Sequence, residues 1–348
     1  MNSLNILILS TTMGMGGADQ QVLQLVTGFK ARGHNVSVVT LVPSQEMGQE
    51  LQAKGVPLFS LDMPRGIPDP RALYRLRQLL HHIKPDILHS QMFHANLLAR
   101  LVRLSIRVPV VISTAQNIYE GNRWREWAYQ FTDSLADFTT QVSIAGRDRY
   151  IEVGAVPREK IKCIPNSIDT HSFKTDLEKR KELRSSLNFG SHFIWLAVGR
   201  FREAKDYPNM LRAFAKVYVS QPRARLVILG QGKLEKELKQ IVASLQIEDA
   251  VQFLGVRRDI CDIMNAADAF VMSSAWEGMP LVLLEAHAVG LPIVTTNVGG
   301  NAEVVLNEKS GFVVPPNNSE QLSHAMNRLM EMSDDERKQM GDYGRKYM

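Results

Sequence analysis

Two glutamates, Glu277 and Glu285, are separated by seven residues in the segment SAWEGMPLVLLEAHAVGLP, residues 274–292. A helix that starts at Pro280 fits this segment, because proline is tolerated at the first helical position and a run of leucine, valine and alanine follows it. Glu277 would then lie in the preceding loop and Glu285 inside an apolar helix. Ordinary solvent exposure explains a single glutamate of this kind. A carboxylate within an apolar helix, however, is costly to bury unless a cation or a pair of sugar hydroxyls binds it.

Two cations follow the end of a predicted strand in the segment VGRFREAKDYPN, residues 198–209. Arg200 and Lys205 lie in the loop after that strand, where both can reach one ligand. The pair suits a diphosphate, because arginine binds oxygens as a fork and lysine adds a point charge. Solvated surface charge is the alternative, since Glu203 and Asp206 are close in the sequence.

Two glycine-rich loops each join a predicted strand to a predicted helix, where backbone N–H groups can bind an anion. One is NVGGNAEVV, residues 297–305, which contains Gly299 and Gly300, and the other is GMGGAD, residues 14–19. A diphosphate held by the amides of the first loop and by the two cations would direct an attached ribose toward Glu285. The remaining glutamate would then face the other end of the ligand.

The GMGGAD loop also raises the alternative of a nicotinamide-dependent dehydrogenase, whose dinucleotide-binding fingerprint joins a strand to a helix in the same way. In that fingerprint an Asp or Glu at the end of the second strand holds a ribose diol. The predicted strand 35–41 ends without such a residue. The sequence therefore disfavours this enzyme class.

Strands and helices alternate along the chain, and the alternation restarts after residue 166. Buried strands of the first series are predicted at 5–9, 35–41, 86–90, 108–114 and 139–144, and those of the second series at 193–200, 225–232, 250–255, 269–274, 291–300 and 311–316. The pattern predicts an α/β fold with two Rossmann-like, doubly wound domains that face each other across a cleft. A chain of 348 residues is long enough for two cores. We expect the domains to cover 1–168 and 169–348.

The composition excludes several other classes of protein. Cys163 and Cys261 are far apart and lack C-x-x-C spacing, so neither a disulfide framework nor a zinc site is expected. No apolar stretch is long enough to cross a bilayer, and residues 1–10 fit a buried strand better than a secretory leader. We therefore expect a cytoplasmic protein.

The net charge of +5 comes from the first half of the chain, where residues 1–165 hold 18 basic and 13 acidic side chains. The excess is concentrated in two leucine-rich segments, 69–85 and 96–109. Their arginines recur at helical spacing, as Arg71, Arg75, Arg77, Arg100, Arg103 and Arg107. Basic amphipathic helices of this kind can lie on an anionic membrane, and two ordinary solvated helix faces are the alternative.

The motifs VGRFREAKDYPNMLRAF, LVILGQG, SSAWEGMPLVLLEAHAVGLPIVTTNVGGNAEVV and GFVVPP closely resemble those of the retaining nucleotide-sugar glycosyltransferases of family 4, which have the two-domain GT-B fold. The resemblance implies that the second domain binds the nucleotide sugar. Arg200 and Lys205 match the residues that hold the diphosphate, and Glu285 matches the glutamate that binds the ribose. Glu277 matches the glutamate near the transferred sugar, and the two glycines of the 297–305 loop match those near the leaving phosphate.

The resemblance is looser in the first domain, which it implies is the acceptor-binding domain. Gly16 and Gly17 match a glycine-rich loop that approaches donor and acceptor. The segment HSQMFHANL, residues 89–97, resembles the one that carries an active-site histidine. We assign that role to His94, at the mouth of a helix, in preference to His89, which follows the strand directly.

The first domain and the C-terminus also depart from the family pattern. Gln116, which we place on the acceptor side together with Asn117, stands where relatives usually have a histidine. A glutamine can form hydrogen bonds but cannot act as a base. Relatives commonly finish with a helix that crosses back onto the first domain. Here either the helix near Asp334 partly serves that purpose or the natural chain is longer.

The mechanism usual in the family has the acceptor hydroxyl attack the anomeric carbon on the face from which the diphosphate leaves, and the phosphate takes the proton. Cations and backbone amides then stabilise the departing charge, which implies neither a cofactor nor a metal. The expected function is that of a retaining hexosyltransferase, which moves a sugar from a nucleotide-diphosphate donor, UDP-sugar in the first instance, to a glycan or lipid-linked glycan.

This expectation places the enzyme in cell-surface polysaccharide biosynthesis, with its basic helices at the inner face of the membrane and no nucleic-acid partner. Two alternatives stay open. One is a different enzyme on the same fold, a nucleotide-sugar epimerase or a phosphorylase, and the other is a nucleotide-sugar-binding subunit without catalysis.

Overall fold

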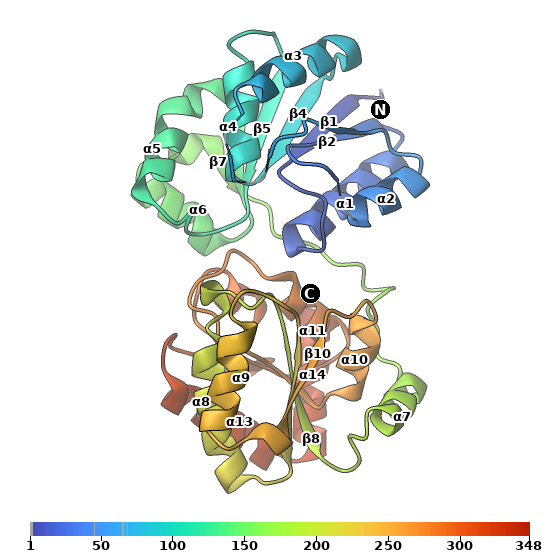
Figure 1. Ribbon diagram of the computed structural model, residues 1–348, viewed down its shortest axis with the longest axis vertical. Helices are drawn as coiled ribbons and strands as arrows, with labels where there is room; N and C mark the ends of the chain where they lie inside the picture. The colour runs from blue at the N-terminus through green and yellow to red at the C-terminus, as the bar shows by residue number, and fades with distance from the viewer. Residues whose placement is uncertain (1–2, 45, 65, 68) are drawn as a thin grey trace. The chain divides into compact units, whose positions relative to one another are not determined.

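The computed structural model describes residues 3–44, 46–64, 66–67 and 69–348. The chain divides into two compact units, Met1–Ser167 and Ile168–Met348. Each unit is built on a parallel β-sheet whose strands are joined by helices (Figure 1). This architecture confirms the predicted α/β class with two Rossmann-like domains.

The strands of each sheet pair in parallel throughout. The first sheet has the order β3-β2-β1-β4-β5-β6-β7, with β1 (Asn5–Ser10), β2 (Asn35–Thr40), β3 (Leu58–Ser60), β4 (Ile87–Gln91), β5 (Val110–Ala115), β6 (Phe138–Gln141) and β7 (Ile161–Cys163). The second sheet has the order β10-β9-β8-β11-β12-β13, with β8 (Phe193–Val198), β9 (Ala224–Leu229), β10 (Val251–Gly255), β11 (Ala269–Met272), β12 (Ile293–Thr296) and β13 (Gly311–Val314).

Helices connect the strands in both units. Those of the first unit are α1 (Gly17–Ala31), α2 (Glu46–Ala53), α3 (Arg71–Ile83), α4 (Phe93–Val102), α5 (Arg123–Thr132) and α6 (Ile144–Glu152). Those of the second are α7 (Leu177–Ser186), α8 (Tyr207–Ser220), α9 (Glu235–Ser244), α10 (Ile260–Ala266), α11 (Leu281–Ala288), α12 (Asn301–Val304), α13 (Ser319–Glu331) and α14 (Asp334–Tyr347). In the part of the chain that the structure describes, each helix falls short of the length and apolar content that a bilayer crossing requires.

The central strands are continuous apolar runs because helices cover both faces of a parallel sheet. In β1, Leu7 and Leu9 pack on one face with residues of α3 and α4, while Ile6 and Ile8 pack on the other face with residues of α1 and α2. This division follows from the alternation of side chains along a strand. It explains why the strand segment NILIL is almost entirely apolar and does not alternate between apolar and polar residues.

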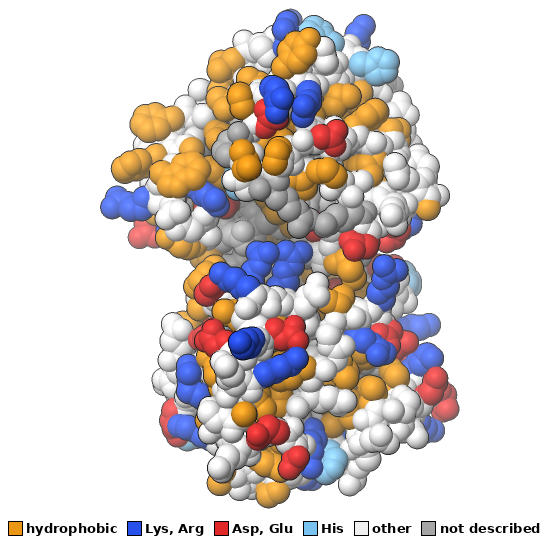
Figure 2. All heavy atoms as spheres, viewed as in Figure 1, with side chains coloured by type: hydrophobic (Ala, Val, Ile, Leu, Met, Phe, Trp, Pro, Cys, Tyr) orange, Lys and Arg blue, Asp and Glu red, His pale blue; other side chains and the backbone are white. Residues whose placement is uncertain are grey.

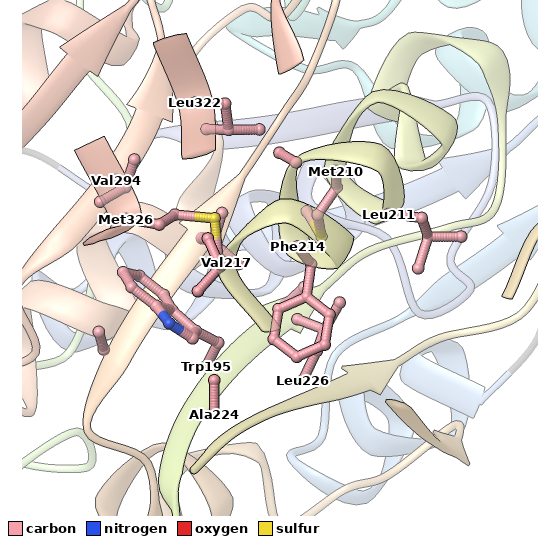
Figure 3. Close-up of a cluster of buried hydrophobic side chains, with 14 of the residues drawn as sticks. Trp195, Met210, Leu211, Phe214, Val217, Ala224, Leu226, Val294, Leu322 and Met326 are labelled. Atoms are coloured by element: carbon pink, nitrogen blue, oxygen red, sulfur yellow. The ribbon is translucent and has the colours of Figure 1, made fainter. Parts of the chain in front are cut away.

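The core of the second unit lies between its sheet and the helices α8, α9 and α13. Trp195 of β8 is fully buried beside Phe214 of α8, Leu226 of β9 and Met326 of α13 (Figure 3). Its indole N–H donates to the sulfur of Met330 at 3.4 Å, so the one polar atom of the ring has a partner. Truncation of a buried aromatic such as Phe214 to alanine costs about 3–5 kcal/mol, which is enough to unfold a marginal domain.

The order of the strands places the candidate site. In the second sheet, β8 lies between β9 and β11. The strands that follow β8 in the chain extend toward one edge of the sheet, and those that follow β11 extend toward the other edge. In open α/β sheets, ligands bind beyond the carboxyl ends of the strands at such a switch point. The loop with Arg200 and Lys205 follows β8, and the loop with Glu277 follows β11.

Arg100 corrects the prediction of two membrane-facing basic helices. Its side chain is fully buried. The guanidinium donates to the hydroxyls of Ser113, Thr132 and Thr139 at 2.8–3.2 Å and to the carbonyl of Tyr129 at 3.0 Å, and it stacks on the Tyr129 ring. The prediction was wrong for this residue because its acceptors come from β5, β6 and α5, which lie far away in the sequence.

Other arginines of the two basic segments are also engaged within the first unit. Arg71 and Arg75 lie 3.0 and 3.8 Å from the carboxylate of Asp69. Arg103 forms an ion pair with Asp137 at 2.8 Å. Much of the charge in these segments is therefore compensated by neighbouring acids or used to hold α3 and α4 in place.

Two element boundaries differ from the prediction for local reasons. Helix α11 begins at Leu281, and Pro280 precedes it as an extended N-cap residue with φ −73° and ψ 122°. The strand predicted at 139–144 ends at Gln141, because Ser143 caps α6 by accepting a hydrogen bond from the N–H of Gly146.

Candidate functional site

Hydrogen bonds join the loops that follow β8 and β11. The N–H of Ala275 donates to the carbonyl of Ala204 at 2.8 Å. The hydroxyl of Ser273 donates to the carbonyls of Lys205 and Asp206 at 2.9 and 2.8 Å. Two segments that lie far apart in the chain are thereby fixed against each other at the switch point.

Lys205 and Glu277 form an ion pair across these loops, with Nζ and Oε1 2.5 Å apart. The same carboxylate oxygen accepts a hydrogen bond from the hydroxyl of Ser274 at 2.7 Å. The lysine and glutamate side chains are 21% and 12% exposed, so solvent screens the pair less than it screens a surface pair. The sequence places both residues at the site but does not reveal that they pair, and it gives no role to Ser274.

Arg200 provides a second cation after β8. The residue is exposed, and its guanidinium has no hydrogen bond or ion pair with any residue that the structure describes. The strand end behind it is held by Tyr207, whose hydroxyl donates to the carbonyl of Gly199 at 3.1 Å. The guanidinium of Arg200 therefore has no partner among the described residues and can donate hydrogen bonds to a ligand, while the strand end before it is held in place.

Glu285 lies in α11, among buried leucine and alanine residues. Desolvation raises the pKa of its carboxyl group from 4.5 to about 7. Among the described residues, no side chain or backbone N–H donates to this carboxylate. The contrast with the paired Glu277 is sharp, since one carboxylate has its partners within the protein and the other lacks them.

The two glycines after β12 have different structural roles. Gly299 has φ +54°, and a Cβ there would lie 2.1 Å from the carbonyl oxygen of Glu277. Only glycine fits this contact without a shift of backbone. The N–H of Gly300 donates to the carbonyl of Gly278 at 2.6 Å, so it is not the free anion donor that the sequence predicts.

The first unit carries a chain of polar side chains at the carboxyl ends of β4 and β5. The amide of Gln116 donates to the carbonyl oxygen of Gln91 at 2.8 Å, and the amide of Gln91 donates to Nε2 of His89 at 3.1 Å. Nε2 of His89 also lies 2.7 Å from the hydroxyl of Thr114, so both side chains hold this ring nitrogen in place. Burial lowers the pKa of His89 to about 4, so this ring stays neutral at physiological pH.

His94 differs from His89 in its surroundings. It is the second residue of α4, and its side chain is exposed. Partial desolvation and the charge of Arg125 lower its pKa. A neutral imidazole of this kind can accept a proton or a hydrogen bond from a ligand. The predicted preference for His94 stays a prediction.

The glycine-rich loop after β1 is held by Asp19. The carboxylate of Asp19 accepts from the N–H of Gly16 at 3.0 Å and from the hydroxyl of Thr12 at 2.9 Å. The amide of Gly16 is thereby used within the loop, while Gly17 is the exposed first residue of α1. Asn117 is exposed at its loop, and its carbonyl accepts from a buried glutamine amide at 2.8 Å.

Both units match families of known proteins. Residues 178–347 match glycosyl transferases group 1, and residues 16–167 match a glycosyl transferase 4-like domain. The UDP-Gal:alpha-D-GlcNAc-diphosphoundecaprenol alpha-1,3-galactosyltransferase of Escherichia coli is 31% identical over 77% of this chain and 72% of that protein. Spore coat protein SA of Bacillus subtilis strain 168 is 30% identical over 95% of this chain and 89% of that protein.

Solved structures share the fold over nearly the whole chain. Anabaena Alr3699/HepE in complex with UDP-glucose superposes with a TM-score of 0.87 at 22% identity, covering 99% of this chain and 94% of that chain. WaaG, a glycosyltransferase involved in lipopolysaccharide biosynthesis, does so with a TM-score of 0.79 at 19% identity, covering 99% and 95%. The chain therefore belongs to the group 1 glycosyl transferases, the GT4-type enzymes with the GT-B fold, as its motifs predict.

Proposed function

We propose that this chain is a retaining hexosyltransferase that moves a sugar from a UDP-sugar to a hydroxyl of a glycan or lipid-linked glycan in cell-surface polysaccharide biosynthesis. The observation that carries the proposal is a combination of groups on the elements that follow β8 and β11: a lysine–glutamate pair, together with an arginine and a desolvated glutamate that have no partner among the described residues. These groups complement a diphosphate, a hexose and a ribose diol.

Similar proteins support the choice of substrates. The name of the E. coli relative specifies UDP-Gal as donor and a diphosphoundecaprenol-linked acceptor. LpsB of Rhizobium meliloti, 27% identical over 83% of this chain, is described as a lipopolysaccharide core mannosyltransferase. The Anabaena structure contains UDP-glucose.

In this proposal, charged and polar groups of the second unit each bind one part of the nucleotide sugar. Arg200 and Lys205 bind the diphosphate, and the Gly299 N–H, which has no partner among the described residues, adds a neutral donor. Glu285 accepts hydrogen bonds from the ribose hydroxyls, which would favour its ionised form and lower its pKa. Glu277 is left to bind a hydroxyl of the sugar.

In the proposed reaction, the acceptor attacks the sugar on the same face from which the diphosphate leaves. The acceptor oxygen forms a bond to the anomeric carbon as the bond from that carbon to the diphosphate oxygen breaks. The acceptor proton passes to the departing phosphate, so no side chain becomes covalently attached. Arg200 and Lys205 stabilise the charge that develops on the diphosphate, the task for which we propose that no metal or cofactor is needed.

The first unit would bind the acceptor. We propose that His94 receives a hydrogen bond from the acceptor or sugar, and that the glycine loop at Gly16 and Gly17 lets the two substrates approach. Gln116 and Asn117 would contact the acceptor through neutral amide groups. The bond from Gln116 to Gln91 orients its amide, which leaves its carbonyl oxygen as an acceptor for a ligand hydroxyl.

A donor panel tests the proposal. UDP-, GDP- and ADP-hexoses are incubated with the protein and a diphospholipid-linked N-acetylhexosamine or a short glycan, and the products are analysed by mass spectrometry and by the anomeric NMR coupling. A new α-linkage from an α-linked donor is the expected result. Donor binding without turnover on any acceptor or on water would establish a binding subunit instead. A sugar with inverted ring stereochemistry would identify an epimerase.

A further inference from the structure

Helix α5 exposes three large aromatic side chains. Trp124, Trp127 and Phe131 are 49%, 54% and 81% exposed. Because they are spaced by three and four residues, they lie on one face of the helix. Figure 2 shows hydrophobic side chains gathered over α5, at the left of the first unit. We call these three residues the α5 aromatic face.

The opposite side of α5 is tied firmly into the first unit. Tyr129 is buried, and its hydroxyl accepts a hydrogen bond from the Asn96 amide at 2.7 Å. Within the aromatic face itself, the half-exposed Trp124 also packs edge-on against Phe93 of α4, with ring centroids 5.3 Å apart. The aromatic face is therefore displayed by a fixed helix, not by a frayed segment.

The charges on α5 favour an anionic partner. Arg123 is exposed and forms no ion pair with any carboxylate that the structure describes, whereas Arg125 is half-buried, donates to the carbonyl of Glu120 at 2.9 Å and stacks on the rings of Phe93 and Trp124. The acidic residue of this helix, Glu126, is neutralised by Arg149 at 2.6 Å. The aromatic face thus begins beside uncompensated positive charge.

We infer that the α5 aromatic face docks on an anionic membrane surface, with the helix axis in the plane of the headgroups. Trp124 and Phe131 are about 10 Å apart along the axis, at 1.5 Å per residue, so all three rings can enter the boundary together. The indole N–H groups of Trp124 and Trp127 have no partner among the described residues and can bond to headgroups or water.

This inference moves the predicted membrane contact from the arginines of α3 and α4 to the aromatic residues of α5. It rests on the proposed function in one respect: a lipid-linked acceptor would bring the enzyme to a membrane. A second copy of the chain or another protein could also cover an aromatic face. Uncompensated positive charge next to tryptophan favours the lipid surface, because protein interfaces more often pair their charges.

Vesicle flotation tests the inference with the full chain. The protein is mixed with vesicles of phosphatidylcholine alone or of phosphatidylcholine with phosphatidylglycerol. The double variant Trp127→Ser/Phe131→Ser, whose rings make no ring contacts within the described chain, should partition at least about tenfold more weakly. Arg123→Gln should weaken binding to the anionic vesicles alone. Tyr74→Ser, at a residue of α3 that is 60% exposed, is the matched control and should float like the wild type.

Further results from these measurements decide the outcome. Equal flotation of the wild type and the double variant would overturn the inference, as would failure of the wild type to bind anionic vesicles. Self-association that the double variant abolishes, without any vesicle binding, would assign the face to a second copy. Stabilisation of every variant by UDP, measured in parallel without lipid, shows that the fold and donor site are intact. Loss of that response in the wild type would instead count against the proposed function.

Discussion

Replacement of Glu285 by glutamine should stabilise the ligand-free protein at alkaline pH. The pKa of this carboxyl group is raised from 4.5 to about 7, because ionisation inside the apolar helix is unfavourable. Each pKa unit corresponds to about 1.4 kcal/mol, so the ionised side chain costs the fold about 3 kcal/mol when fully charged. Glutamine has nearly the same shape and carries no charge, so the cost disappears.

The stabilising effect of this substitution depends on pH between 4.5 and about 7. Below pH 4.5 the carboxyl is protonated in both folded and unfolded states, and the stabilising effect of the neutral form is complete. As pH rises from 4.5, the unfolded state ionises while the folded state stays protonated, so that stability is lost progressively, and the loss is complete once pH has risen through the folded pKa near 7. The Glu285→Gln variant should therefore exceed the wild type by less than about 1 kcal/mol at pH 5 and by about 3 kcal/mol at pH 8.

Urea denaturation at these two pH values measures the difference, with tryptophan fluorescence as the signal because Trp195 reports the buried core of the second unit. Glu331→Gln, at an exposed glutamate that ends α13, is the matched control and should change stability by less than about 0.5 kcal/mol at either pH. A variant that is less stable than the wild type at pH 8 would refute the reasoning, because it would show that the Glu285 carboxylate has a partner that favours its charge.

The same variant should bind UDP about 10- to 100-fold more weakly, since hydrogen bonds from two ribose hydroxyls to a carboxylate are replaced by weaker bonds to an amide. Calorimetry in two buffers that differ in ionisation enthalpy should show that UDP binding to the wild type at pH 7 releases protons, because the bound diol lowers the pKa of Glu285. Binding without proton release would place the ribose elsewhere.

Three more predictions concern the same site. Glu277→Gln should lower stability by about 1–3 kcal/mol and reduce transfer about a hundredfold, because Lys205 loses its partner at 2.5 Å; urea denaturation and initial rates measure both effects. Gly299→Ala should cost more stability than Gly190→Ala in the same denaturation assay, since φ is similar at +54° and +50° but only at Gly299 would Cβ meet a backbone carbonyl, at 2.1 Å; equal losses would show that this contact relaxes. Transfer activity should survive EDTA, because the cationic side chains carry the charge stabilisation, and activity that returns only with a divalent cation would contradict the proposed metal-free mechanism.

Strands could be predicted from the sequence where burial on both faces restricts them to apolar residues. Central strands such as β1 and β8 are covered on both faces, so their residues are almost all apolar and stand out in the sequence. The edge strand β3 is three residues long and only partly buried, and nothing in LFS separates it from a loop. Strand β7 is equally short and also lies at an edge, so both escaped prediction.

The residues of the candidate site were chosen from their positions in the motifs, but their contacts could not be predicted from the sequence. Motif position identified Lys205 and Glu277, yet their pairing depends on β8 and β11 being neighbours, and local patterns do not give strand order. Arg100 shows the same limit, because helical spacing marks it as basic but not as buried. The engaged amide of Gly300 is likewise fixed by a turn that comes from another loop.

Glu277 and Glu285 occupy opposite electrostatic positions although they are the same residue type a few positions apart. Glu277 is satisfied by Lys205 and Ser274 before any ligand arrives, whereas desolvation holds Glu285 partly protonated near pH 7. An anion alone can compensate Arg200 but leaves Glu285 without donors. A ligand that joins a diphosphate to a diol compensates both, so the site should prefer a nucleoside diphosphate over inorganic diphosphate. That preference should grow as pH rises through 7, because the penalty that the diol relieves is the cost of ionising Glu285.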